Sequence, residues 1–167
     1  MKPTRLIAVL CLCFFIGKSS AQSVNLIPQP QSLELAKGVF DRNAQVNFST
    51  SGGNLSNELR FLTALFPNEN ATGKPAQIKL KINPSMDKAE SYELQISSNE
   101  INISGADAAG VFYGIQTLHQ IILQNPKELP ALKIQDAPRF AYRGMHLDVG
   151  RHFFDLDYLK TYVDMIA

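Results

Sequence analysis

Residues 92–125 decide the fold, and they read YELQISSNEINISGADAAGVFYGIQTLHQIILQN. Apolar and polar residues alternate in two short runs on either side of Ser98-Asn99, which predicts two strands joined by a hairpin turn. After Asp107, which can cap a helix, the apolar residues change to helical spacing. This stretch therefore predicts a strand, a strand and a helix in succession.

The helix expected after Asp107 has one apolar face, formed by Ala108, Val111, Ile115, Leu118 and Ile122. Gly110 and Gly114 each cost a helix about 1 kcal/mol relative to Ala. Their spacing by four residues places both on one side, where the helix can approach a sheet closely. His119 lies on the same helix, and we interpret it as a packing or surface residue.

The flanking sequence extends this unit in both directions. Residues 44–49 and 76–84 alternate as strands should, and Leu55 to Phe66 has apolar residues at helical spacing before Pro67. Residues 129–140 contain Pro130 and Pro138 and are interpreted as a linker. Residues 22–135 are thus predicted to form a small α+β domain, an antiparallel sheet with helices on one face.

Residues 1–21 have a different composition from the rest of the chain. Basic residues precede an apolar run from Leu6 to Gly17, and small residues follow it. This layout predicts a secretory signal peptide, with an N-terminal membrane anchor as the alternative. After its removal we expect no stable membrane insertion, and an exported protein of the periplasm, cell surface, medium or, in a eukaryotic host, lysosome.

The cysteine, histidine and charge content limits the kinds of site and partner that we expect. Both cysteines, Cys11 and Cys13, lie in the predicted signal peptide, so the mature chain has no disulfide and no thiol chemistry. The three histidines lack the paired spacing of zinc sites, and we expect neither metal nor cofactor. The formal charge of +1, without any Lys/Arg-rich run, argues against a nucleic-acid partner.

Residues 142–154, YRGMHLDVGRHFF, crowd charged groups into an apolar stretch. Alternation over residues 141–149 predicts a strand, residues 150–154 a turn, and Asp155 the cap of another helix. The charges gather at the strand's C-terminal end, where (β/α)₈ barrels build their active sites.

Asp148 and Arg151 admit two interpretations. Arg151 carries a rigid fork of donors suited to vicinal hydroxyls, with Asp148 as its support or as a second contact to the ligand. Alternatively, the two residues form a buried structural ion pair. Arg143 lies on the opposite face of the predicted strand from Asp148, which favours a structural role for Arg143. His152 is interpreted as a hydrogen-bonding core or rim residue.

Three segments carry a resemblance to a known family: LIPQPQSLEL (26–35), GADAAGVFYGIQTLHQII (105–122) and DAPRFAYRGMHLDVGRHFF (136–154). Together they resemble glycoside hydrolase family 20, the β-N-acetylhexosaminidases. The resemblance implies that residues 136–167 begin a catalytic TIM barrel, that Arg151 binds the ring hydroxyls of the sugar, and that Asp148 lies beside it. It also implies N-acetylhexosamine-terminated glycans as partners.

The family's catalytic machinery is expected outside these residues. The reaction uses the substrate's own acetamido group as nucleophile, assisted by an adjacent Asp-Glu pair. The sequence contains no Asp-Glu dipeptide and no tryptophan, and a barrel needs about 250 residues. We therefore expect an N-terminal fragment that is inactive alone. The alternative is a secreted, non-catalytic module that binds carbohydrate or protein.

Overall fold

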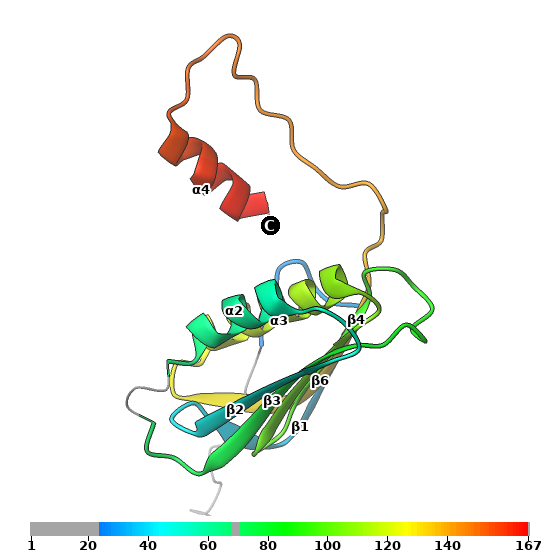
Figure 1. The fold of residues 1–167 in the computed structure, drawn as a ribbon, viewed down its shortest axis with the longest axis vertical. Helices are drawn as coiled ribbons and strands as arrows, with labels where there is room; N and C mark the ends of the chain where they lie inside the picture. Colours follow the sequence, from blue (N-terminus) through cyan, green and yellow to red (C-terminus); the bar gives the residue numbers. More distant parts are fainter. Residues whose placement is uncertain (1–23, 68–70, 167) are drawn as a thin grey trace, which may run out of the picture.

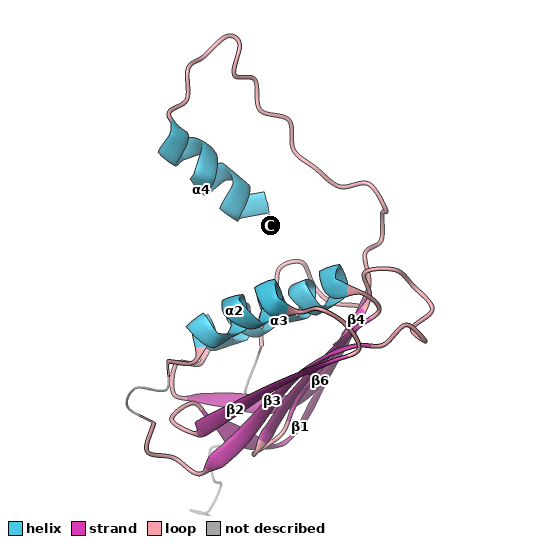
Figure 2. Cartoon of the chain, in the orientation of Figure 1, coloured by secondary structure: helices cyan, strands magenta, loops and turns pink. Residues whose placement is uncertain are grey.

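The computed structural model describes residues 24–67 and 71–166, so the predicted signal peptide lies outside the described residues. A twisted sheet carries two helices on one face, and a long segment leads away from it to a third helix (Figures 1 and 2). The elements in chain order are β1 Ser32–Asp41, β2 Gln45–Ser51, α2 Ser56–Leu65, β3 Pro75–Ile82, β4 Tyr92–Ile96, β5 Glu100–Gly105, α3 Ala108–Gln124, β6 Glu128–Asp136 and α4 Leu156–Ile166.

The six strands lie in the order β1-β6-β4-β5-β3-β2. β2 pairs parallel with β3, and β3 pairs parallel with β5, whereas the other neighbours are antiparallel. The expectation of an antiparallel sheet was therefore wrong for this half, although the α+β class is confirmed. For β2 and β3 the physical reason is α2, which returns the chain to the starting end of β2 so that β3 runs in the same direction. For β3 and β5 the reason is that β4, which separates them in the chain, lies on the other side of β5 and pairs antiparallel with it.

The core lies between the sheet and the helices α2 and α3. The predicted apolar face of α3 is buried there, with Val111, Ile115 and Leu118 fully inaccessible to solvent. Asp107 caps the helix as predicted, because its Oδ1 accepts a hydrogen bond of 2.8 Å from the Gly110 amide. A Cβ atom at Gly110 would lie 2.3 Å from the Ser91 carbonyl oxygen, so the helix approaches the sheet as closely as its glycines allow.

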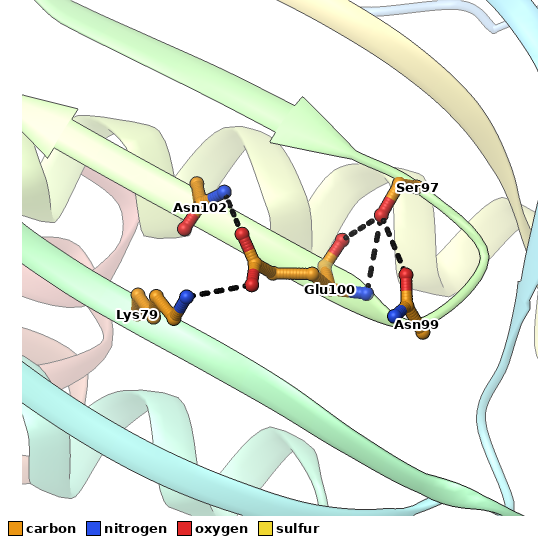
Figure 3. Close-up of polar contacts among 5 residues, drawn as sticks. All are labelled: Lys79, Ser97, Asn99, Glu100 and Asn102. Carbon is orange, nitrogen blue, oxygen red and sulfur yellow. Dashed lines mark hydrogen bonds and ion pairs between the residues drawn. The ribbon is translucent and has the colours of Figure 1, made fainter.

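The opposite face of the sheet is polar and open. Figure 3 shows the Glu100 carboxylate of β5 between Lys79 of β3, at 2.6 Å, and the side-chain amide of Asn102. The hairpin turn at residues 97–99 is fixed by Ser97, whose Oγ accepts a hydrogen bond of 3.2 Å from the Glu100 amide. The Lys79 ammonium, with help from Asn102, holds the pKa of Glu100 below its usual range.

The interpretation of residues 129–140 as a linker was wrong for most of that stretch. Residues 128–136 form β6, which pairs with both β1 and β4 and is largely buried. Pro130 lies opposite Val39, next to the irregularity in the pairing of β1 where the register shifts. A residue without a backbone N–H is tolerated inside a sheet at such a position.

The predicted strand over residues 141–149 is absent from the structure, in which residues 137–155 contain neither helix nor strand. Among the described residues, no strand lies beside this segment to exchange backbone hydrogen bonds with it. The helix after it does form, and Asp155 caps it through a bond of 2.7 Å from the Tyr158 amide to Oδ1. Apolar side chains of this part are exposed, including Tyr142, Met145, Phe153 and Met165.

The close approach of α3 gives a first testable prediction. We expect Gly110→Ala to lower the free energy of unfolding by about 2 kcal/mol, because the added methyl group meets backbone atoms that cannot move aside. Urea unfolding measures this change. Gly144→Ala is the matched control, since its new Cβ meets nothing closer than the Tyr142 hydroxyl at 3.9 Å. Equal stabilities for the two variants would contradict the prediction.

Candidate functional site

The structure brings together the two residues that the sequence singled out for ligand binding. Arg151 Nε donates to Asp148 Oδ2 in an ion pair. The other carboxylate oxygen, Oδ1, accepts backbone bonds of 2.9 Å from Gly150 and 3.2 Å from Arg151. The Asp148 side chain therefore closes a turn over residues 148–151, and it also binds the Nε atom of Arg151.

The far end of the Arg151 fork points to solvent. Its side chain is 91% exposed, and within residues 24–67 and 71–166 its two terminal nitrogens form no hydrogen bond. The interpretation of Asp148 and Arg151 as a buried pair is therefore wrong for this structure. A guanidinium held at Nε by a carboxylate, with both terminal nitrogens available, can donate to two adjacent hydroxyl groups.

The charge state of Asp148 follows from the same contacts. The Arg151 guanidinium holds the pKa of the Asp148 carboxyl below its usual range, and the amides of Gly150 and Arg151 contribute to the same shift. A carboxylate that accepts several hydrogen bonds is favoured in its ionised form. Asp148 thus stays charged through the neutral range, and it keeps the fork oriented there.

Arg143 contacts the small domain and not the Asp148–Arg151 pair. Its Nη2 donates to the Glu90 carboxylate and, over 2.9 Å, to the Tyr113 hydroxyl, while Nη1 donates to the Phe140 carbonyl at 2.6 Å. The guanidinium carbon also lies 5.4 Å from the centre of the Tyr113 ring. The bond to Glu90, followed by the one to Tyr113, raises the pKa of Arg143 above its ordinary value.

His152 takes part in an aromatic stack and forms no hydrogen bond with the described residues, contrary to its interpretation as a hydrogen-bonding residue. Its ring meets that of Phe154 edge-on at 4.8 Å, and Phe154 stacks on Tyr158 of α4 at 4.6 Å. These contacts connect the turn at Asp148 to the first turns of α4. His152 is exposed, so it lies at the rim of this segment and not in a core.

Two residues of this region were missed from the sequence. Glu90 and Tyr113 hold Arg143, yet Glu90 lies 53 residues away in a polar loop and Tyr113 lies between apolar residues of α3. No local pattern marks either residue, because the partner that gives them a role is distant in the chain. Only the spatial contact reveals them.

Neither a metal site nor a membrane span is found in the part of the chain that the structure describes. No group of three or more His, Cys, Asp and Glu side chains is placed to bind an ion there. The described helices are likewise too short or too polar to cross a bilayer.

Family models match almost the whole chain after its first residues. Residues 23–137 match the model described as glycosyl hydrolase family 20, domain 2, and residues 140–167 match glycosyl hydrolase family 20, catalytic domain. A β-hexosaminidase of Vibrio vulnificus is similar over 151 residues with 29% identity, which covers 89% of this chain and 18% of that protein.

Solved structures agree with these matches. A glycoside hydrolase family 20 β-N-acetylglucosaminidase is 38% identical with a TM-score of 0.67, over 83% of this chain and 27% of that one. A β-N-acetylhexosaminidase from Bacteroides fragilis is 26% identical with a TM-score of 0.73, over 86% of this chain and 31% of that one. The chain thus spans no more than about a third of the length of these relatives.

The turn at Asp148 gives a prediction for its pH dependence. Because the pKa of Asp148 is lowered in the folded chain, its bonds are present above the usual aspartate range of about pH 4 and are lost as the pH falls through the lowered value. We expect Arg151→Ala to raise the midpoint measured by NMR titration of the Asp148 carboxyl carbon. It should do so only partly, since the backbone bond from Gly150 remains.

The conservative variant Arg151→Lys is the control for that titration. A lysine keeps the positive charge but lacks the Nε donor that pairs with Asp148 Oδ2. The midpoint for Lys should therefore lie between those of Arg and Ala. An identical Asp148 midpoint in the unchanged chain and in Arg151→Ala would contradict the prediction.

Proposed function

Because the chain belongs to glycoside hydrolase family 20, we propose that it forms part of an exported β-N-acetylhexosaminidase. The proposed reaction removes terminal β-linked N-acetylglucosamine or N-acetylgalactosamine from the non-reducing ends of glycans, with retention of configuration. The family matches along residues 23–137 and 140–167, and the names of the similar proteins, support this proposal.

In this proposal residues 1–21 are a signal peptide, residues 22–135 the small domain and residues 136–167 the start of the catalytic TIM barrel. The match of residues 140–167 to the catalytic-domain model supports the last assignment. Residues 141–149 would then become a barrel strand once neighbouring strands offer backbone partners, since a strand needs a paired edge to persist.

The observation that carries the proposal at residue level is the exposed fork of Arg151 on the carboxylate of Asp148. Arg151 would bind two neighbouring ring hydroxyls of the terminal sugar with its terminal nitrogens, as a planar fork does best. Asp148 would orient that fork and offset its charge. Both groups are available before any sugar binds, which lowers the entropic cost of ordering the site.

The 167 residues do not contain the groups that the reaction needs. Substrate-assisted cleavage requires an acid to protonate the leaving oxygen and a group to orient the acetamido oxygen, and the sequence has no Asp-Glu pair to do so. Only 28 residues match the catalytic domain, against about 250 in a typical barrel. We therefore expect the 167-residue chain alone to bind weakly and to hydrolyse nothing.

The function is tested by purifying the protein from its native source, measuring its intact mass, and assaying a chromogenic N-acetyl-β-D-glucosaminide. We expect a mass well above 18.5 kDa together with hydrolysis. The recombinant 167-residue chain should show no hydrolysis. A native protein of 18.5 kDa or less without activity would instead support a non-catalytic binding module.

Arg151 is then tested in the hydrolysing protein. We expect Arg151→Ala to lower kcat/KM by about 10²- to 10³-fold, because two charge-assisted hydrogen bonds to the sugar are lost. Lys160→Ala is the control, since Lys160 is an exposed cation of α4 with a long contact of 3.9 Å to Asp157. If both variants keep full activity, Arg151 does not bind the sugar.

A further inference from the structure

Glu90 has an unusual backbone conformation for a residue of its type. Its φ is 60°, and among residues 24–67 and 71–166 it is the only residue other than glycine with a positive φ. The left-handed region is disfavoured for long side chains, and such residues gather where a function depends on them. The presence of glutamate, and not glycine, at position 90 therefore needs an explanation.

The conformation of Glu90 is held by the capping residue of α3. Asp107 uses Oδ1 to cap the helix at Gly110 and uses Oδ2 to accept a bond of 3.0 Å from the Glu90 amide. The next residue, Ser91, accepts a bond of 2.9 Å from the Ala106 amide through its carbonyl oxygen. The turn before β4 is thus locked against the beginning of α3 on two successive residues.

The locked backbone presents the Glu90 carboxylate to Arg143. The side chains are partly exposed, 33% for Glu90 and 39% for Arg143, and Tyr113 of α3 completes the site with its hydroxyl and its ring. Three parts of the chain therefore meet at one guanidinium: the turn before β4, helix α3 and the segment after β6. We refer to Glu90, Tyr113 and Arg143 as the clamp.

At the start of the segment that carries Asp148 and Arg151, the Ala137 carbonyl oxygen accepts a bond of 2.9 Å from Gln31 Nε2. Beyond that bond, the clamp is the one polar attachment of the described residues 138–154 to the small domain. Within the described residues from 138 to 154, Arg143 alone forms hydrogen bonds to the small domain. Arg143 precedes Asp148 by five residues and Arg151 by eight, and no helix or strand fixes those residues. In this structure the direction in which the turn at Asp148 leaves the small domain therefore depends on where Arg143 is held. In the proposed barrel, the clamp would hold the strand formed by residues 141–149 against the small domain at Arg143.

We propose that Glu90 is a positioning residue, which uses the clamp to fix the segment that presents Arg151 to its ligand. The small domain then sets the orientation of the Arg151 guanidinium. The left-handed conformation of Glu90 is retained because it places the Glu90 carboxylate within hydrogen-bonding distance of Arg143. That the ligand is a sugar rests on the proposed function, whereas the clamp itself does not.

The clamp is tested on the 167-residue chain by limited digestion with trypsin, which cleaves after arginine once that side chain enters its binding pocket. Arg143 is held by the clamp, whereas the Arg151 side chain is 91% exposed and is held only at Nε by Asp148, so it provides a reference in the same molecule. We expect cleavage after Arg143 to be about tenfold slower than after Arg151, a ratio set by the bonds that must first open.

Three variants separate positioning from general stability. Glu90→Gln and Glu90→Gly should both raise the Arg143-to-Arg151 cleavage ratio by about five- to tenfold. Glu90→Gly should also leave Tm unchanged or higher, because glycine adopts a φ of 60° without strain. The control is Glu93→Gln, which weakens a pairing with Lys133 on the open face and should leave the ratio unchanged.

An unchanged ratio in both Glu90 variants would overturn the proposal, and so would a loss of folding in Glu90→Gly, because the carboxylate would then act on stability alone. In the hydrolysing protein, Glu90→Gln should raise KM by about tenfold more than Glu93→Gln does. A raised cleavage ratio without any change in KM would refute the positioning step. Because the digestion uses no sugar, failure of the proposed hydrolase function leaves its result intact.

Discussion

The close packing of α3 on the sheet is the constraint on which the other features depend. Gly110 lies against the Ser91 carbonyl group, and a Cβ at Gly114 would lie 2.5 Å from a methyl group of Ile103. Larger residues at either position would lift the helix and open the core beneath it. The two glycines therefore give up helix propensity in exchange for burial of the apolar face of α3.

The same packing gives Asp107 two tasks. A helix cap satisfies backbone donors that the first turn leaves unpaired, and one carboxylate oxygen is enough for that. The second oxygen of Asp107 binds the Glu90 amide, and it does so only because the helix start lies next to the turn before β4. A local capping interaction thereby becomes a long-range contact, which sets the position of the Glu90 carboxylate.

The segment after β6 is held by a different kind of contact from the sheet, whose strands are held by backbone hydrogen bonds. Its order comes from side-chain contacts: the clamp at Arg143, the turn closed by Asp148, and the ring contacts of His152, Phe154 and Tyr158. Such contacts are individually weak at an exposed surface, and they leave many apolar side chains uncovered. Residues 140–167 of this segment match the glycosyl hydrolase family 20 catalytic domain. In the barrel that we propose, neighbouring strands would supply backbone bonds and cover those side chains.

Much of the chain could be predicted because its patterns are short-range. The hairpin at Ser98-Asn99, the caps at Asp107 and Asp155, the apolar face of α3 and the proximity of Asp148 to Arg151 each involve residues a few positions apart. Three features depended on tertiary structure: the parallel pairing of β2, β3 and β5, the place of β6 between β1 and β4, and the contact of Glu90 with Arg143. Alternation of apolar residues shows that a strand can form, but a partner distant in the chain decides whether it forms and in which direction it pairs. Residues 141–149 have the alternation but no partner strand among residues 24–67 and 71–166, and so they remain without a strand in this structure.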